Sequence, residues 1–423
     1  MPRFRLGAAT LLVATVALAC PSDGGRVDGP TSASPPVSPV PPRGTIAVGV
    51  LGEPATLDPY SPLASDLTYW LARPIYPSLY RFTGDDAIVP DLAGDLETSP
   101  GGALVTLRRA RWSDGTRITA GDVVASIRRA RPPSGFARIR SARARGRDVV
   151  ELRGNLVGWT GALATRAFVL PGGRWRANGP TAGSFRVAGR VPGLRLAYEA
   201  DRSFVPQPAL RRVDITFTHS LEMMLGLLER ERLDAAILPM SVNLDDRLDE
   251  LGLEHAEGEF TETIYLDLDG AAPDRRFRER IVAAVDADAL YEGFIRDDGR
   301  VVAPRVSDGA GPDLHVQFAT AVGDELLMLM QRAMQLQFKR ARITAELVTL
   351  DPKTFYGSWA RDDPSEIALR RSSPGPSGRA RFDAVPLFRV ETVIAWLPGL
   401  TGPAPTASPD GPLWNLEAWS LSG

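Results

Sequence analysis

The side chains that most often perform catalysis or hold metals are scarce in this chain. It has three histidines, His219, His255 and His315, and none has the spacing of an HExxH or HxH metal motif. The single cysteine, Cys20, lies near the N-terminus, which leaves none for Cys–His catalysis or a cysteine zinc site in the folded part. No GxSxG elbow, P-loop or GxGxxG motif is present. We therefore expect no catalytic residues, no metal site and no cofactor.

Two pairs of adjacent acidic residues are the remaining candidates for acid–base chemistry. Asp245-Asp246 and Asp362-Asp363 fall in turn-like stretches. The two carboxylates of a glycosidase converge from different elements of the fold, whereas neighbours in a turn are more often solvated. Solvated loop acids are therefore the favoured interpretation. A hydrolase remains the alternative, and turnover in a substrate screen would be needed to support it.

The composition is that of a soluble protein with more than one lobe. Of 423 residues, 44% are hydrophobic and 24% charged, and a chain of this length favours two or three lobes. The formal net charge of −2 gives no attraction to nucleic acid as a whole. Five arginines form a local basic run: Arg138, Arg140, Arg143, Arg145 and Arg147. No aromatic residues interleave with them, so a solvated face is favoured over a polyanion site.

The N-terminus has the pattern of an export signal. Arg3 and Arg5 precede an apolar run at residues 6–19, which as a helix would span roughly 21 Å, too short for a membrane core. The run ends in Ala17-Leu18-Ala19-Cys20, which resembles a bacterial lipobox with Cys20 as the lipidated residue. The alternative is cleavage after Ala19 that leaves a free thiol. Lipidation is favoured because an exposed single cysteine is a liability in an oxidising compartment.

The residues that follow are typical of a flexible tether. The stretch from Cys20 to position 43 is rich in Pro, Ser and Gly and has no apolar periodicity. As an extended polyproline II chain it would reach on the order of 70 Å. A tether of this kind next to a lipid anchor suits a receptor on the outer face of the cell membrane.

The first elements of the folded part place aromatic residues after a strand. TIAVGVL at 45–51 predicts a buried strand, and a cluster of aromatic and apolar residues follows it, including Tyr69 and Trp70. Side chains that follow the end of a strand are often found in clefts. Further along, Asp114-Gly115 predicts a turn, and Thr119 with Asp122 predicts a capping box at the start of a helix.

The remaining pattern alternates strands with helices. Pro192-Gly193 predicts the turn of a hairpin, a helix near 220–232 leads to a strand starting near Ala235, and residues 277–295 read as helical. In the amphipathic stretch 325–341, Met328, Met330 and Met334 have helical spacing, which indicates core packing. This rhythm predicts α/β lobes.

Several stretches resemble one family of binding proteins. Residues 94–131, GDLETSPGGALVTLRRARWSDGTRITAGDVVASIRRAR, resemble the signature of the extracytoplasmic solute-binding proteins that serve peptide and nickel ABC transporters. The matching positions are Trp112, Asp114, Gly115, Thr119, Ala120, Asp122, Val123, Ser126 and Ala130. Similar stretches follow in the family's order: GEPATLDP at 52–59, NGPTAGSFRV at 178–187, DRRFRERIVAAVDADAL at 274–290, VIAWLPGLTG at 393–402 and PLWNLEAW at 412–419.

The resemblance implies an α/β, bilobed periplasmic-binding-protein-like fold with mixed sheets and a discontinuous first lobe. We expect a signal peptide at 1–19 and the lipidated tether at 20–43. Lobe I then comprises 44–60, 175–270 and 385–423, and a small subdomain at 61–174 is inserted in it. A shortened lobe II comprises 271–384.

The resemblance also implies a function. The protein would enclose a peptide-like or other polar solute between two lobes and deliver it to an ABC transporter permease, as a monomer without nucleic acid. We expect Tyr69, Trp70, Arg371, Ser372 and Ser373 to contact the ligand. The alternative is that Tyr69 and Trp70 are core residues and that the two serines only form a loop. The segments after Val301 and between Ile367 and Pro386 are shorter than in the family, so neither a peptide nor nickel is implied. The alternative is a degenerate member that acts as a surface interaction or signalling lipoprotein.

Overall fold

The computed structural model describes most of the chain that follows the predicted tether. The described residues are 44–61, 64–85, 87–130, 139–154, 158–164, 167–218, 220–241, 243–268, 275–295, 312–322, 324–350, 355, 367–372, 384–406 and 410–422. The predicted signal peptide, Cys20, the tether, Ser373 and the acidic pair Asp362-Asp363 lie outside them. Within these ranges, no helix is both long enough and apolar enough to cross a membrane.

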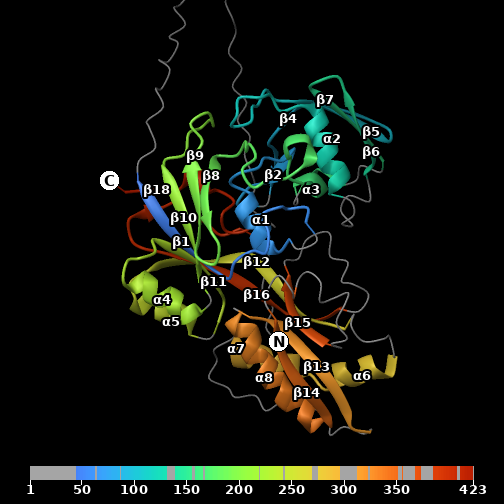
Figure 1. Ribbon diagram of the computed structural model, residues 1–423, viewed down its shortest axis with the longest axis vertical. Coiled ribbons are helices and arrows are strands. Elements are labelled where there is room, and N and C mark those ends of the chain that lie inside the picture. The colour runs from blue at the N-terminus through green and yellow to red at the C-terminus, as the bar shows by residue number, and fades with distance from the viewer. Residues whose placement is uncertain are drawn as a thin grey trace, which may run out of the picture. The chain divides into compact units, whose positions relative to one another are not determined.

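A mixed sheet of ten strands organises the described part (Figure 1). Its strands in spatial order are β14 (Ile343–Leu350), β13 (Leu314–Ala321), β15 (Ile367–Ser372), β12 (Glu254–Asp267), β16 (Ala384–Trp396), β11 (Ala235–Pro239), β1 (Thr45–Leu51), β10 (Arg212–Thr218), β9 (Arg195–Ala200) and β8 (Phe185–Val191). β1 runs parallel to β10 and β11, and β13 runs parallel to β14. The hairpin predicted around Pro192-Gly193 is confirmed by the antiparallel pair β8 and β9.

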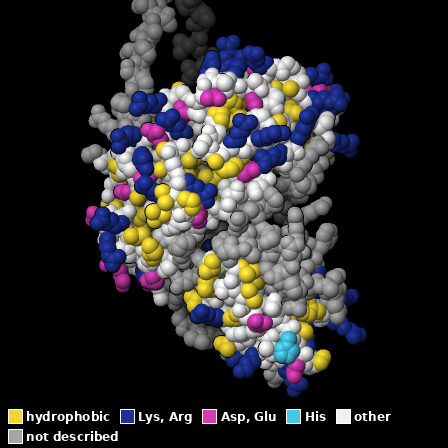
Figure 2. Space-filling view, in the orientation of Figure 1, with side chains coloured by type: hydrophobic (Ala, Val, Ile, Leu, Met, Phe, Trp, Pro, Cys, Tyr) yellow, Lys and Arg dark blue, Asp and Glu magenta, His cyan; other side chains and the backbone are white. Residues whose placement is uncertain are grey.

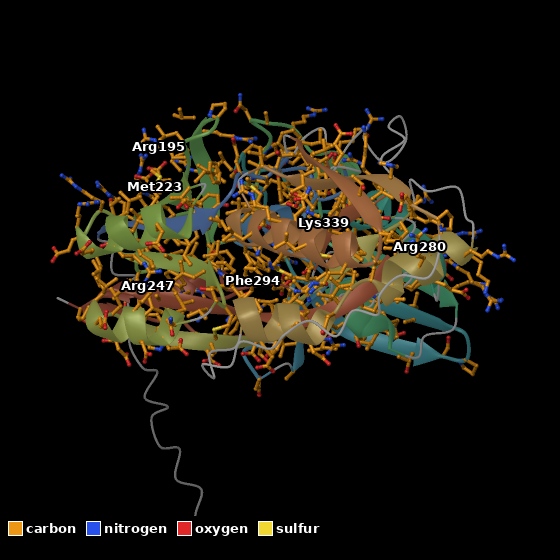
Figure 3. All side chains as sticks on the ribbon, turned by 90° about the horizontal axis from the view of Figure 1, so that it is seen from below. Arg195, Met223, Arg247, Arg280, Phe294 and Lys339 are labelled. Atoms are coloured by element: carbon orange, nitrogen blue, oxygen red, sulfur yellow. The ribbon has the colours of Figure 1, made fainter. Side chains whose placement is uncertain are left out.

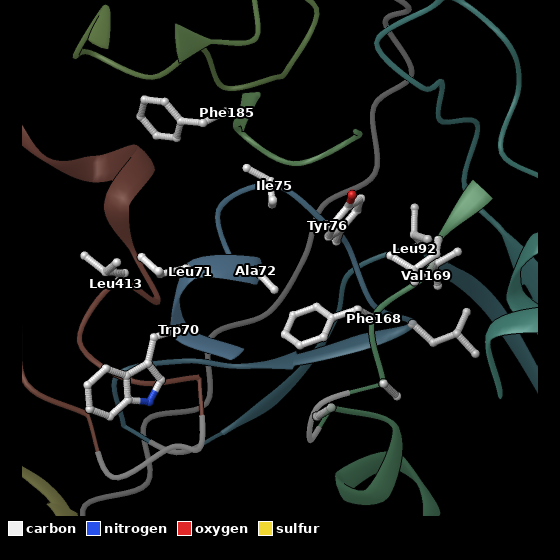
Figure 4. Packing of buried hydrophobic residues seen from close by; sticks show 14 of the residues in the cluster. Trp70, Leu71, Ala72, Ile75, Tyr76, Leu92, Phe168, Val169, Phe185 and Leu413 are labelled. Atoms are coloured by element: carbon white, nitrogen blue, oxygen red, sulfur yellow. The ribbon is translucent and has the colours of Figure 1, made fainter. Parts of the chain in front are cut away.

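The first hydrophobic core packs around α1 (Asp66–Ala72) and one end of this sheet. Its fully buried aromatic side chains include Phe168, Phe185, Tyr198 and Trp419. Figure 4 shows Phe168 pointing toward the segment that carries Ala72. The core therefore joins α1 to residues far away in sequence, including the C-terminal part of the chain.

A four-stranded antiparallel sheet and two helices pack against the same core. The strands in spatial order are β4 (Ala93–Ser99), β5 (Gly102–Leu107), β7 (Val149–Gly154) and β6 (Ile139–Arg145), and the helices are α2 (Ala120–Arg129) and α3 (Trp159–Ala164). The smaller elements nearby are β2 (Tyr80–Phe82), β3 (Ile88–Pro90), the 3₁₀ turns η2 (Pro171–Gly173) and η3 (Leu416–Ala418), β17 (Leu400–Thr401) and β18 (Ser420–Leu421). The predicted capping box at Thr119 and Asp122 is confirmed at the start of α2.

The described part of the basic run, on β6 and in the turn after it, is exposed to solvent, as predicted. Arg140, Arg143, Arg145 and Arg147 are exposed, and Arg138 lies outside the described residues. Arg145 and Arg153 both bind Glu151, and their hydrogen bonds lower the pKa of that carboxyl to about 2. Figure 2 shows basic side chains spread over this face with acidic ones among them.

The second core packs α6 (Arg275–Ala283), α7 (Ala287–Phe294) and α8 (Glu325–Arg340) against the other end of the ten-stranded sheet. Met330 and Met334 are fully buried in it, which confirms their predicted role, whereas Met328 is only partly buried. Arg280 of α6 donates to the carbonyl oxygens of Ala341 and Arg342, both at 3.2 Å, just after α8 ends. Figure 3 labels Arg280 on α6 and Lys339 in the last turn of α8. A cation there offsets the negative end of the helix dipole.

Two predicted stretches differ in detail. The helical pattern at 277–295 forms two helices, because Asp286 accepts a hydrogen bond from the backbone NH of Ala289 and so starts α7 as a separate helix. Asp245 and Asp246 lie in the first turn of α5 (Leu244–Glu250), not in a loop. Acidic residues are favourable there because they face the positive end of the helix dipole. The strand predicted near Ala235 is β11, and it follows α4 (Leu221–Glu229) as expected.

Candidate ligand-binding cleft

A cavity of about 280 Å³ lies where elements of the two cores meet. The first core contributes the ends of β1 and β11 and the start of α1, and the second contributes β15, part of β12 and the turn between β13 and α8. The lining residues are Val50, Leu51, Gly52, Glu53, Ala64, Ser65, Asp66, Leu67, Tyr69, Trp70, Ile237, Leu238, Pro239, Tyr265, Ala321, Val322, Asp324, Arg371 and Thr392. We call this cavity the cleft.

Tyr69 and Trp70 form the aromatic wall of the cleft. Both lie on α1, which begins at Ser65 with a capping box formed with Thr68. Tyr69 stacks on Phe168, with ring centroids 6.5 Å apart and planes 10° apart. Trp70 is 7% exposed, and it packs against Gly411 so closely that a Cβ there would lie 2.2 Å from its ring. Core contacts therefore fix both rings, while each presents part of its surface to the cleft.

Glu53, on the same wall, is bound by the β8–β9 hairpin. Arg190 donates to its carboxylate at 2.6 Å, and the backbone NH of Gly193 donates to the other oxygen at 2.7 Å. This pair ties the loop after β1 to the hairpin. Glu53 is therefore a positioning carboxylate whose charge Arg190 balances.

Arg371 and Asp324 form the charged wall. The Nε of Arg371 lies 2.8 Å from a carboxylate oxygen of Asp324, and both side chains are mostly buried. The other oxygen of Asp324 accepts from the backbone NH of Leu327 and so caps α8. Asp324 thus holds the guanidinium and the helix end together, which fixes the direction of Arg371 at the cleft.

The predicted ligand residues are partly brought together. Tyr69, Trp70 and Arg371 line one cavity although about 300 positions separate them in sequence. Ser372 ends β15, where it pairs with Thr263 of β12. Ser373, like the predicted lipidation residue Cys20, lies outside the described residues.

Sequence reasoning missed Asp324, Tyr265 and Thr392. One signal was available for Asp324, since it follows β13, and ligands of α/β proteins bind beyond the carboxyl ends of parallel strands. The cleft residues that follow β1 and those at the carboxyl end of β11 obey the same rule. Tyr265 and Thr392 lie within antiparallel strands, and their position depends on pairing between segments that the sequence does not specify.

Neither of the two histidines that the structure describes lines the cleft. His255 lies on β12 with its Nε2 3.6 Å from Asp245, and His315 lies exposed on β13, while His219 falls outside the described residues. Among the side chains that the structure describes, no group of three or more His, Cys, Asp or Glu residues is arranged to hold a metal ion. The cleft instead offers aromatic, apolar and charged surfaces, which is the composition of a small-molecule binding site.

Comparison with known proteins gives one family and a set of similar folds. Residues 87–313 match the profile of the bacterial extracellular solute-binding proteins, family 5, middle region. No curated protein matches the sequence.

Three solved structures illustrate the similarity of the fold. The oligopeptide-binding protein AppA of Bacillus subtilis, in complex with a nonapeptide, has a TM-score of 0.75 at 14% identity, over 90% of this chain and 99% of its own. MoaA of A. tumefaciens R10, in complex with mannopinic acid, has a TM-score of 0.73 at 19% identity with the same coverage. NikZ of Campylobacter jejuni, in complex with Ni(L-His), has a TM-score of 0.70 at 14% identity, over 89% and 99%.

Proposed function

This chain belongs to the bacterial extracellular solute-binding proteins of family 5, and on that premise we propose that it captures a small polar solute and delivers it to an ABC importer permease. The family consists of binding proteins, and we extend this to the chain itself: it releases its ligand unchanged. The expected bilobed fold agrees with the fold of the similar structures. Lobe boundaries at 60/61, 174/175, 270/271 and 384/385 remain part of the proposal.

The observation that carries this proposal is the two-sided lining of the cleft. Tyr69 and Trp70 pack on the first core, whereas Asp324 caps α8 and Arg371 lies on β15, two elements that build the second core. A solute in the cleft gains its full set of contacts only when both sides touch it. Binding therefore favours the closed arrangement, and a permease that recognises this arrangement can distinguish loaded from empty receptor.

The cleft favours a small solute that carries charge or strong dipoles. Its volume of about 280 Å³ is near the lower end for ligand pockets, which are usually about 300–1,000 Å³. Asp66 on α1 and Arg371 on β15 place a carboxylate and a guanidinium on different walls. A zwitterionic solute with a short apolar part against Trp70 would match all three surfaces.

The ligands of the similar structures are chemically diverse. They are a nonapeptide for AppA, mannopinic acid for MoaA and a nickel–histidine complex for NikZ. At 14–19% identity these ligands do not transfer to this chain, but they define which compounds to test first.

A thermal-shift screen of the purified chain tests the proposal. The compounds are dipeptides, longer peptides, free amino acids, opines and nickel–histidine, each from micromolar to millimolar concentration. Selective binding raises the midpoint of unfolding by mass action. If no compound raises it, the surface-lipoprotein alternative gains support and transport of these solutes is contradicted.

Matched variants locate the binding in the cleft. Tyr69→Phe keeps the stacking on Phe168 and removes the hydroxyl, whereas Tyr69→Ala removes both. Arg371→Lys keeps the charge beside Asp324 but not the planar fork, which matters if the ligand carries a carboxylate. Unchanged affinity in Tyr69→Ala and Arg371→Lys would remove these residues from the site.

We further propose that Cys20 carries a lipid that anchors the receptor to the outer face of the cell membrane. The support is the sequence pattern of a short apolar run, small residues and a single cysteine, followed by a Pro- and Ser-rich stretch. Replacing Cys20 by Ser in cells should move the protein from the membrane fraction to the medium or periplasm. Retention of the Cys20→Ser protein on membranes would contradict lipid anchoring but not solute binding.

A further inference from the structure

A second cavity, of about 430 Å³, shares no lining residue with the cleft. It lies where the loop at 175–181 meets the segment after α1, the turn after Trp112 and strand β8. Its lining residues are Leu57, Ile75, Tyr76, Ser113, Asp114, Trp175, Ala177, Asn178, Gly179, Pro180, Thr181, Arg186 and Val187. We call it the Trp175 cavity.

Backbone hydrogen bonds build its walls. The NH of Ser113 donates to the carbonyl oxygen of Thr181 at 2.7 Å, and the NH of Thr181 donates back to the hydroxyl of Ser113 at 3.1 Å. Ala182 and Gly183 both donate to the carbonyl oxygen of Ile75, at 3.1 and 3.0 Å. These contacts fix the cavity without a ligand, as is usual for small-molecule sites.

One buried hydroxyl in this wall has no hydrogen-bond partner in the described part of the chain. Thr181 is 3% exposed, and its Oγ1 has no hydrogen-bond partner among the residues that the structure describes. A buried polar group left in this state destabilises the folded protein, because it has lost its hydrogen bonds to water. Because Thr181 lines the cavity, a bound molecule with its own hydroxyl or carbonyl group would relieve that destabilisation. The Thr181 hydroxyl can both donate to it and accept from it.

The charges at the rim are already balanced by the protein. Asp114 accepts from the backbone NH and the hydroxyl of Thr116, at 2.9 and 2.6 Å. Arg186 donates to Glu199 at 2.8 Å. Burial raises the pKa of Tyr76 above its ordinary value, so its hydroxyl stays neutral. The groups left to define a ligand are therefore uncharged: hydroxyls, apolar side chains and the half-buried indole of Trp175.

We propose that the Trp175 cavity binds a small uncharged sugar unit, with a ring face on the indole of Trp175 and a hydroxyl bonded to Thr181. A pyranose ring offers both surfaces that the cavity requires, since its C–H face packs on an aromatic ring and its hydroxyls donate and accept hydrogen bonds. The sugar can be free or part of a polysaccharide chain. This site is independent of the cleft and of solute delivery.

Saturation-transfer NMR on the full chain tests the proposal, with glucose, galactose and N-acetylglucosamine as free sugars and dextran as a polymer of glucose. At least one probe should give a signal, and a signal from dextran alone would identify polymer-linked sugar as the source. Thr181→Val keeps the shape of the side chain, removes the unpartnered hydroxyl and should not lower the unfolding midpoint. It should weaken binding about tenfold, as expected for one lost hydrogen bond.

The control variant is Tyr69→Ala, which alters the cleft and should leave sugar binding unchanged. No signal with any of the four probes overturns the proposal, and so does undiminished binding by Thr181→Val. If Tyr69→Ala abolishes the signal while Thr181→Val keeps it, the sugar occupies the cleft. That result would contradict sugar binding in the Trp175 cavity and would leave the proposed role of the cleft in solute capture unaffected.

Discussion

Among single residues, Gly411 decides how Trp70 is presented to the cleft. Its backbone has φ +70°, a conformation that favours glycine, and a Cβ there would lie 2.2 Å from Cδ1 of Trp70. The chain near the C-terminus thus forms a wall on which the indole rests. The absence of a side chain at Gly411 therefore determines where the indole of Trp70 on α1 can lie.

Gly411→Ala should lower the free energy of unfolding by about 2–4 kcal/mol, from backbone strain and overpacking together. Urea denaturation measures this loss. Gly252→Ala is the matched control, since Gly252 has φ +65° and a Cβ added there would meet no atom within 4 Å, so only strain remains. If Gly411→Ala and Gly252→Ala lose the same free energy of unfolding, the contact with Trp70 does not contribute to the loss.

Asp410, which precedes Gly411, should make the free energy of unfolding of the protein depend on pH. Its carboxylate is 2% exposed and lies 3.6 Å from Arg73, which also binds Asp91 at 3.2 Å. Burial raises the pKa of Asp410 above its ordinary value, although Arg73 opposes the shift. The folded state therefore holds this proton to a higher pH than the unfolded state does.

The contribution of Asp410 to stability is consequently complete below its unfolded pKa of about 3.9 and is lost as pH rises through the folded pKa. Asp410→Asn removes this dependence, so the variant should gain stability relative to the parent as pH increases from about 4 to 8. Urea unfolding at several pH values gives the difference. A difference that stays constant or falls with pH would contradict the assignment.

Among elements, α2 illustrates how a local sequence signal serves tertiary structure. Thr119 and Asp122 cap the helix reciprocally, with the NH of Thr119 donating to Asp122 at 2.8 Å. The second carboxylate oxygen of Asp122 accepts from the NH of Gly172 at 2.7 Å. The cap therefore also fixes η2, which leads into the loop of the Trp175 cavity.

Thr119→Ala should cost about 1 kcal/mol of unfolding free energy, the usual value for a lost N-cap. Asp122→Ala should cost more, because it also releases Gly172. Thr119→Ser retains the capping hydroxyl and should lie close to the parent in the same urea titration. If the serine variant loses as much as the alanine variant, the hydroxyl is not what stabilises α2.

At the scale of the molecule, β12 and β16 link the two cores. Ile264 and Val390 belong to the second core, whereas Ala256 and Ile394 pack on the first. The pairing of the two strands shifts register between Gly258 and Thr261. Such an irregularity bends and twists a strand, so β12 changes direction between the part that packs on the first core and the part that packs on the second.

Binding in the cleft should therefore be seen on both sides of it at once. With a solute found in the thermal-shift screen, hydrogen exchange should slow in residues 64–70 and in residues 320–327 together, because closure buries both. Residues 139–145 of β6 serve as the internal reference. Slower exchange in the first segment alone would show that the solute binds one lobe without closure.

Local chemistry explains why much of the fold could be predicted. The strand at 45–51, the hairpin at Pro192-Gly193 and the cap at Thr119 depend on neighbours in sequence, and each is found where it was predicted. The stretch at 94–131, which includes Trp112 and Asp122, resembles the family signature and correctly indicated the family. The boundary between α6 and α7 was missed because one capping aspartate outweighed a continuous apolar pattern.

The sequence by itself determined α/β elements and a family, and it pointed to two aromatic positions after the first strand; the export signal stays a prediction. Only the tertiary structure decided that Arg371 meets Asp324, that Trp70 rests on Gly411 and that Thr181 lines a second cavity. The physical reason is distance along the chain. Capping and turns involve residues a few positions apart, whereas these contacts join segments tens to hundreds of positions apart through strand pairing and core packing.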